Sequence, residues 1–124
     1  MMRRTYPFIG LFLLAVFVAV GCEPEKEVGS ETAVMSPASS AGRADNDEGV
    51  GHYKQGHWDV SEGHFRKAIK ADANLAEAHY NLALALDKMG KHEAATAEFK
   101  KAVELAPANP AIKDSAILKK HIAM

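Results

Sequence analysis

The chain is short of cysteine, of aromatic residues and of excess charge. Its 124 residues include one cysteine, and 15 Lys and Arg residues nearly balance 16 Asp and Glu residues. One cysteine cannot form an internal disulfide, and the CxxC and CxxCH patterns of zinc ribbons, thioredoxin-like redox sites and c-type haem attachment are absent. The balanced charge argues against nucleic acid as a partner, because binding phosphates needs a basic face. The length predicts one small domain.

Catalytic motifs are also missing. The sequence has neither a phosphate-binding Gx4GK[ST] loop nor a GxSxG nucleophile motif. Its acidic residues lie among lysines, as on solvated helix faces, and no carboxylate pair has the apolar setting that would shift a pKa. We therefore expect no enzymatic activity and no cofactor.

The N-terminal residues have the pattern of an export signal. Arg3 and Arg4 precede an apolar run from Phe8 to Val20 that only Gly10 interrupts. A run of this length is too short to cross about 30 Å of hydrocarbon, which needs about 20 apolar residues. It is typical of a secretory signal peptide. An uncleaved anchor with an idle thiol at Cys22 is the alternative.

The run ends in "AVGC", which resembles the lipobox of bacterial lipoproteins, with Ala19 in place of the usual Leu. The resemblance implies removal of residues 1–21 and acylation of Cys22, so that acyl chains anchor the protein in a membrane. It implies a location at the bacterial cell envelope, on the inner or outer membrane, with the domain facing the periplasm or the exterior. Residues 22–44 are rich in Glu, Pro, Ser and Gly, and this composition predicts a disordered tether.

An internal repeat begins where the tether ends. Shifting the sequence by 34 residues superimposes identical pairs that include Gly56 on Gly90 and Phe65 on Phe99. In the second unit, Ala78, Leu82 and Leu86 recur every four residues, which indicates one face of a helix. Further identical pairs are Ala44 and Ala78, Lys54 and Lys88, Lys67 and Lys101, and Ala68 and Ala102.

Helix ends follow the same pattern. Gly90 is expected to end the first helix of the second unit, because glycine tolerates the left-handed conformation found there. Pro107 ends the second helix, and Asn109-Pro110 predicts the start of a last helix that runs to about residue 122. The repeat therefore predicts two helical hairpins, at about 42–75 and 76–109, and one further helix.

A 34-residue unit of two helices resembles the tetratricopeptide repeat (TPR). The resemblance implies an all-α fold: a short α-solenoid of two TPR hairpins within residues 45–109, closed by a capping helix at 110–124. The first unit matches the family pattern less well than the second. Two repeats are few for a stable array, so we expect a partner or self-association into a homo-oligomer. The positions that match the structural pattern are Gly49, Gly56, Phe65, Ala68, Leu82, Ala83, Gly90, Ala95, Phe99, Ala102 and Pro107.

The TPR resemblance implies a concave groove that binds a protein or a peptide and is lined by the first helix of each unit. Tyr53 and Tyr80 are expected to be exposed in this groove. Exposed aromatic side chains indicate a binding surface, and this favours groove binding. The alternatives are a solvated face or a face covered by the tether. The candidate groove residues are Val50, Tyr53, Lys54, Tyr80, Asn81, Leu84, Asp87 and Lys88.

Histidines suggest a different role. His52, His57 and His64 fall within the first hairpin, but metal sites need three or four convergent ligands, and polar surface or helix packing explains the residues as well. We assign no metal. Three hypotheses remain: a TPR adaptor or assembly lipoprotein, a structural subunit that completes a homo-oligomer or larger solenoid, and a metal- or pH-responsive envelope sensor.

Overall fold

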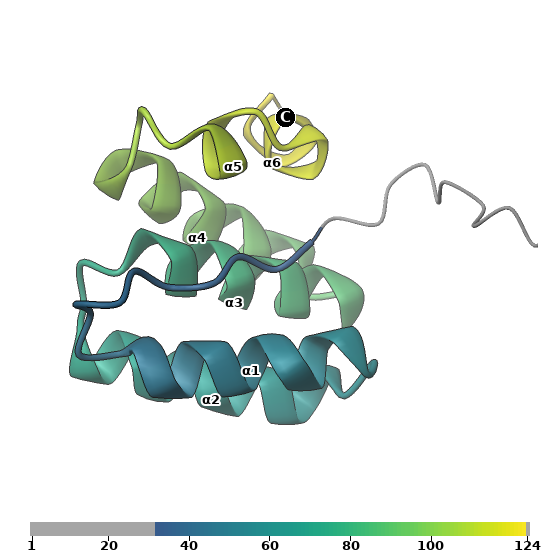
Figure 1. The fold of residues 1–124 in the computed structure, drawn as a ribbon. Helices are drawn as coiled ribbons and strands as arrows, with labels where there is room; N and C mark the ends of the chain where they lie inside the picture. The colour runs from purple at the N-terminus through teal and green to yellow at the C-terminus, as the bar shows by residue number, and fades with distance from the viewer. Residues whose placement is uncertain (1–31, 124) are drawn as a thin grey trace, which may run out of the picture.

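The computed structural model describes residues 32–123, and this part of the chain folds into α-helices joined by short turns (Figure 1). The predicted signal peptide and Cys22 lie outside the described residues. Within 32–123, no helix has the length and apolar character needed to span a membrane. The helices are α1 (Arg43–Lys54), α2 (Trp58–Ala71), α3 (Ala76–Lys88), α4 (His92–Leu105), α5 (Pro110–Lys113) and α6 (Ala116–Ile122).

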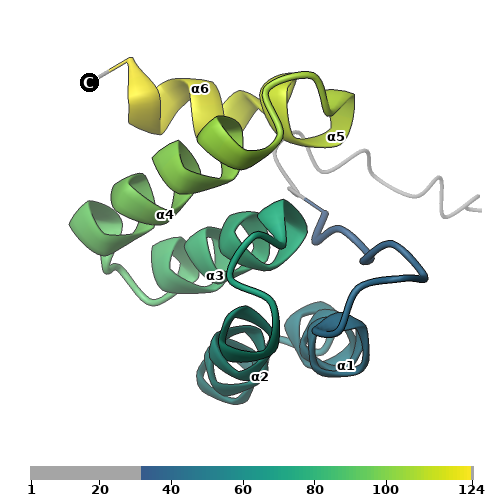
Figure 2. The same ribbon diagram turned by 90° about the vertical axis from the view of Figure 1, so that its left-hand side faces the viewer.

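The helices pair as hairpins, which confirms the all-α repeat fold. α1 packs on α2, α3 packs on α4, and α2 joins the two hairpins by packing on α3 (Figure 2). The predicted turn glycines have the expected backbone, with φ of 79° at Gly56 and 77° at Gly90. The two turns also share a hydrogen bond that spans five residues, from the amide of His57 to the carbonyl of His52, and from Lys91 to Leu86. Equivalent sequence thus produces equivalent turns.

The repeat positions build the core. Phe65 and Phe99 are fully buried, and the ring of Phe65 lies directly against Gly49 where α1 and α2 cross. α3 is buried on every side from Ala78 to Leu86, as expected for a helix that is apolar almost all round. The buried residues at pattern positions are Gly49, Phe65, Ala68, Leu82, Ala83, Ala95, Phe99 and Ala102.

The C-terminal helix differs from the sequence prediction, which has one helix from 110 to 122. The structure breaks it into α5 and α6, with Asp114 and Ser115 between them. The Ser115 hydroxyl oxygen accepts a hydrogen bond from the Leu118 amide (3.3 Å) and so caps α6. The same oxygen accepts a bond from the Tyr80 hydroxyl at 2.9 Å. A tertiary contact to α3 therefore fixes a helix start inside the predicted helix.

A buried histidine links the two helices of the second hairpin. His79 Nδ1 lies 2.7 Å from Glu98 Oε2, and its Nε2 lies 3.0 Å from the Ala73 carbonyl oxygen. Burial by itself lowers the pKa of His79, but the hydrogen bonds to Glu98 and Ala73 outweigh it and raise that pKa above its ordinary value of about 6.5. The imidazolium satisfies both acceptors because both of its nitrogens are donors, whereas the neutral ring can donate to only one.

The close crossing of α1 and α2 yields a first prediction. A Cβ added to Gly49 would lie 2.6 Å from Phe65 Cε1, whereas one added to Gly51 would meet nothing within 4 Å. Gly49→Ala is expected to lower the free energy of unfolding by about 1–3 kcal/mol through overpacking. Gly51→Ala, on the open side of the same helix, should raise it by up to about 1 kcal/mol through helix propensity. Urea denaturation measures both, and equal stabilities for the two variants would contradict this account of the crossing.

The His79–Glu98 pair yields a second prediction. Because the folded-state pKa of His79 is raised, its contribution to stability is fully present below about pH 6.5 and is lost as pH rises through the folded-state value. The wild type should therefore lose more unfolding free energy between about pH 6 and pH 9 than Glu98→Gln, which keeps an acceptor but removes the charge. Denaturation series at several pH values measure the difference, and parallel profiles for the two proteins would refute the assignment.

Candidate functional site: a peptide segment in the inner groove

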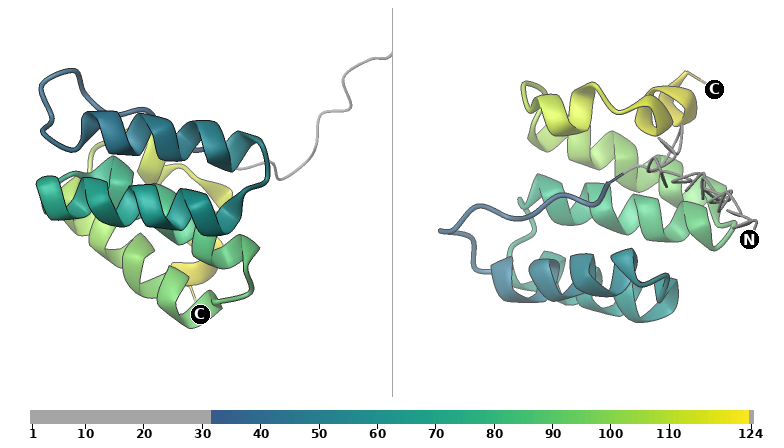
Figure 3. Two further views of the ribbon diagram at one scale, coloured as in Figure 1. Left: turned by 90° about the horizontal axis from the view of Figure 1, so that it is seen from below. Right: turned by 45° about the vertical axis from the view of Figure 1, so that its right-hand side comes forward.

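The residues before α1 run along the inner face of the array. Residues 32–37 have no regular secondary structure and lie beside α3 and above α1, and residues 38–42 then turn into α1 (Figure 1, Figure 3). Ala33 is buried within the main hydrophobic core, and Val34 packs against it half-buried. The sequence predicts a disordered tether up to residue 44. Residues 32–42 depart from that prediction because the groove supplies the contacts that their own composition lacks.

Two buried asparagines hold the backbone of Val34. The Val34 amide donates to Asn81 Oδ1 at 2.7 Å, and Asn81 Nδ2 donates back to the Val34 carbonyl oxygen at 2.7 Å. Asn46 Nδ2 donates to the same carbonyl at 3.0 Å, and Asn81 Nδ2 also donates to Asn46 Oδ1 at 2.8 Å. The two side chains bind the backbone amide and carbonyl of Val34 and not its side chain, so their recognition does not depend on which side chain occupies position 34.

A second contact continues this pattern along the repeat. The Ser36 amide donates to Asp47 Oδ1 at 3.1 Å, two residues after Val34. Asp47 and Asn81 stand 34 residues apart and therefore occupy the same position in the two repeats. In an extended chain, alternate residues face the same side. The same position of each repeat therefore supplies the side-chain oxygen that accepts a hydrogen bond from one of two alternate amides in the extended segment.

The far end of the segment is also anchored. The Ser40 hydroxyl donates to Asp72 Oδ2 at 3.0 Å, beyond the C-terminus of α2, and accepts from the Gly42 amide at 3.2 Å. Gly42 lies so close to α2 that an added Cβ would be 2.5 Å from the Ala68 carbonyl oxygen. The segment is therefore held at both of its ends.

A comparison with protein families agrees with this architecture. A tetratricopeptide repeat model matches residues 46–110, which include both hairpins apart from the first three residues of α1. The chain belongs to the tetratricopeptide repeat family. The comparison with curated proteins found no match. TPR domains typically are protein–protein interaction modules without catalytic activity, so the repeat supports a binding role at this coarse level.

The candidate groove residues of this TPR array occupy three kinds of position. Tyr53 and Tyr80 are buried, in contrast to the exposure expected from the sequence. Tyr80 packs edge-on against Phe99 with centroids 5.6 Å apart, and Tyr53 packs edge-on against Trp58 at 4.9 Å. Of the eight candidates, Val50, Tyr53, Tyr80, Asn81 and Leu84 are buried, Asp87 is half-buried, and Lys54 and Lys88 are exposed.

Sequence reasoning missed Asn46 and Asp47 in this groove. The identical pairs between the two units do not include Asn46 or Asp47, because Tyr80 and Asn81 occupy the equivalent positions of the second unit. Asp47 and Asn81 nevertheless show a usable signal, because both are hydrogen-bonding residues at one position of a 34-residue repeat on the groove-lining helix. Asn46 has no such counterpart, and only the fold brings it beside Asn81, 35 residues away.

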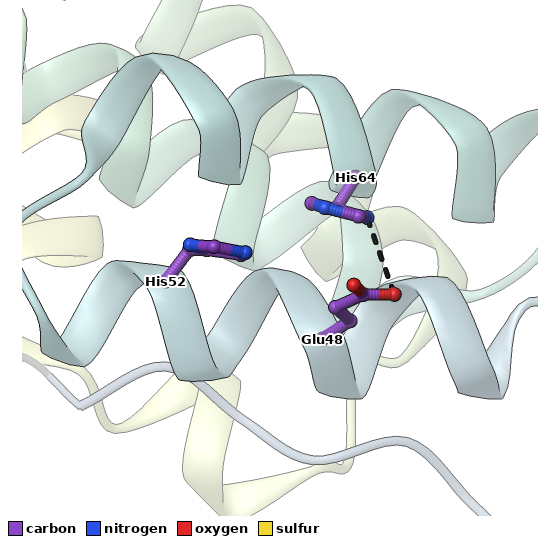
Figure 4. A group of neighbouring side chains, drawn as sticks. All are labelled: Glu48, His52 and His64. Carbon is purple, nitrogen blue, oxygen red and sulfur yellow. Dashed lines mark ion pairs between the residues drawn. The ribbon is translucent and has the colours of Figure 1, made fainter.

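The three histidines of the first TPR hairpin do come together. The rings of His52 and His64 lie nearly parallel with centroids 5.3 Å apart, and His52 Nδ1 is 3.4 Å from His57 Nδ1. His64 Nδ1 lies 3.8 Å from Glu48 Oε2 (Figure 4). The Asp45 carboxylate is also 3.8 Å from this nitrogen. This nitrogen is buried and has no hydrogen-bond partner. The sequence anticipated the histidines as a group, but not the two acidic residues facing them.

Proposed function

We propose that this protein is a lipid-tethered TPR adaptor of the bacterial cell envelope, which binds an extended segment of a partner protein in its inner groove. The observation that carries the proposal is the pair of equivalent contacts from Asn81 and Asp47 to alternate backbone amides, those of Val34 and Ser36. The chain's own segment stands in for the partner in this arrangement.

The contacts define the chemistry of the partner. A side chain as small as that of Ala33 is needed where the segment enters the core, because that position is buried at 5% exposure. The position of Met35 is tolerant, since its side chain is 53% exposed. The partner is therefore an extended stretch with a small apolar residue followed by residues that leave their amides free, which excludes proline at the positions equivalent to Val34 and Ser36.

The chain's own segment competes with such a partner. Each neutral hydrogen bond contributes about 0.5–1.5 kcal/mol net, so the few bonds that hold residues 32–36 amount to a modest barrier. A partner segment that makes the same bonds and adds further contacts would displace it. The groove is thereby kept filled until a partner of higher affinity is present, and its buried asparagines are never left without hydrogen-bond partners.

The N-terminal sequence supports the tethering part of the proposal. The Arg pair, the apolar run and the "AVGC" end together resemble a lipoprotein signal, and a lipid on Cys22 would hold the TPR domain at a membrane surface. In this proposal the lipid sets the location and the groove selects the partner.

Binding in trans tests the groove. Val34→Pro removes the amide that Asn81 accepts from and should release the segment, while Met35→Pro changes the exposed neighbour and should leave it docked. A fluorescent peptide with the sequence of residues 32–37 should bind the Val34→Pro chain at least tenfold more tightly than it binds the wild type or Met35→Pro. Fluorescence anisotropy measures the affinities.

Two controls sharpen this test. Hydrogen exchange of the Ser36 amide should accelerate in Val34→Pro and not in Met35→Pro, which shows independently that the segment has left. The same peptide N-methylated at valine lacks the donor and should not bind. If the segment is released and the peptide still fails to bind up to millimolar concentration, the groove does not recognise extended peptides and the proposal fails.

Lipidation is tested at Cys22. Cys22→Ser removes the acylation site, so the protein should leave the membrane fraction or persist as an uncleaved precursor. Fractionation of cells followed by intact-mass measurement detects either outcome. A processed Cys22→Ser protein that still sediments with membranes would contradict lipid tethering.

A further inference from the structure

Three side chains from three helices meet at the C-terminal end of the array. Asp87 lies in the last turn of α3, His92 begins α4, and His121 lies in α6. His92 Nδ1 is 2.7 Å and His121 Nε2 is 2.9 Å from the same atom, Asp87 Oδ1. One potential ligand atom of each residue lies within 4.8 Å of the other two. From the sequence, Asp87 is predicted only as a groove residue, and nothing there groups it with these histidines.

We infer that Asp87, His92 and His121 form a binding site for a divalent first-row transition metal ion such as Ni²⁺, Co²⁺ or Zn²⁺. Two imidazole nitrogens and one carboxylate oxygen are donors that such ions favour, whereas Ca²⁺ and Mg²⁺ favour oxygen alone. This site is separate from the asparagine contacts in the groove and does not depend on the proposed peptide binding.

The distances are close to those that an ion would impose. In octahedral coordination, as for Ni²⁺ or Co²⁺, two neighbouring donors about 2.1 Å from the ion subtend a right angle at it and lie about 3.0 Å apart. The separation of His121 Nε2 from Asp87 Oδ1 is 2.9 Å, so this edge needs almost no adjustment. The side chain of His92 is 64% exposed and can turn toward the ion, while that of His121 is 5% exposed and is fixed by its surroundings.

Hydrogen bonds through Thr96 fix the orientation of the His121 ring. Its Nδ1 is 2.8 Å from Thr96 Oγ1, and the Thr96 hydroxyl is 2.9 Å from the His92 carbonyl oxygen. When Thr96 donates to that carbonyl, its oxygen accepts from Nδ1–H of His121. Nε2 is then the nitrogen that offers its lone pair to an ion, and the ion takes the place of the hydrogen between Nε2 and Asp87 Oδ1. A metal-bound histidine commonly donates its other N–H in this way, which fixes the tautomer and the ring orientation.

The site opens into a cavity of about 320 Å³ lined by the three ligands together with Ile117 and Lys120. The cavity leaves room for water molecules to complete the coordination of an ion. The ammonium of Lys120 opposes a cation there, so this residue lowers the affinity. Removing its charge is therefore expected to tighten binding.

The other histidine group is a natural comparison. Glu48, His52 and His64 also offer ligand atoms within 4.8 Å of one another (Figure 4). In that group, however, His64 Nδ1 is 3.8 Å from Glu48 Oε2, and the Glu48 side chain is 62% exposed. The corresponding distances to the Asp87 carboxylate are 2.7 and 2.9 Å, so the wider group in the first hairpin provides the control for the site at α3, α4 and α6.

An ion at the proposed site would join α6 to the second hairpin. The three ligands belong to α3, α4 and α6, so the ion links the last helix to both helices of that hairpin. Because an ion that binds only the folded state stabilises it by mass action, the melting temperature should rise with metal concentration.

Metal titration tests the inference. The full chain, free of any added histidine tag and carrying Cys22→Ser to remove the thiol, is titrated with Ni²⁺ by calorimetry and with Co²⁺ by visible absorption. We expect one ion per chain. Asp87→Asn and Thr96→Val should each weaken binding at least tenfold, Lys120→Gln should strengthen it several-fold, and His64→Gln should leave it within twofold of the parent.

Circular dichroism identifies any variant that fails to fold, in which case the remaining folded variants decide. The inference is overturned if the parent chain does not bind Ni²⁺ or Co²⁺ at submillimolar concentration. It is also overturned if folded Thr96→Val and Lys120→Gln bind as the parent does, or if His64→Gln alone abolishes binding, since the ion then occupies the first hairpin.

Discussion

The close crossing of the two helices within each hairpin is the constraint on which the rest of this structure depends. At the first crossing, Gly49 leaves no room for even one carbon atom before the ring of Phe65. The equivalent residues of the second hairpin, Ala83 and Phe99, are fully buried. Because a small residue on one helix receives a large ring from the other, the helices approach closely and each hairpin has one geometry. Repetition of that geometry aligns α1 with α3 and creates the inner face.

The inner face owes its binding chemistry to polar residues placed on buried helices. Asn46 and Asn81 are both fully buried, and a buried carboxamide left without hydrogen bonds costs about 1–3 kcal/mol. The peptide group of Val34 supplies most of those bonds. The asparagines thus explain why residues 32–36 lie against α1 and α3. In the proposed function, they are also the reason that a partner replacing this segment would have to be an extended chain. The core is held largely by apolar contacts. At these two asparagines, the inner face needs the backbone of another chain segment as a hydrogen-bond partner.

The C-terminal end of the array is held together by a different kind of contact. There the helices are short, and polar contacts fix their positions: Tyr80 with Ser115, and His121 with Thr96 and Asp87. Two histidines converge on the Asp87 carboxylate because the short α6 packs across the junction between α3 and α4. A metal ion at this point would replace the hydrogen bonds to Asp87 with coordination bonds and would join the same three helices. The groove and this junction are therefore independent features of one small array.

The sequence by itself determined the repeat, its two hairpins and the turns at Gly56 and Gly90, because these depend on local periodicity and on backbone conformations that glycine tolerates. Only the tertiary structure decided that Ser115 starts a new helix, that Tyr80 is buried rather than exposed, and that residues 32–36 lie in the groove. It also decided which histidines meet an acidic residue. Each of these depends on partners that are distant along the chain, such as Val34 and Asn81, which are 47 residues apart. Composition and periodicity predict helices, turns and repeats, but they do not specify which distant residues come into contact.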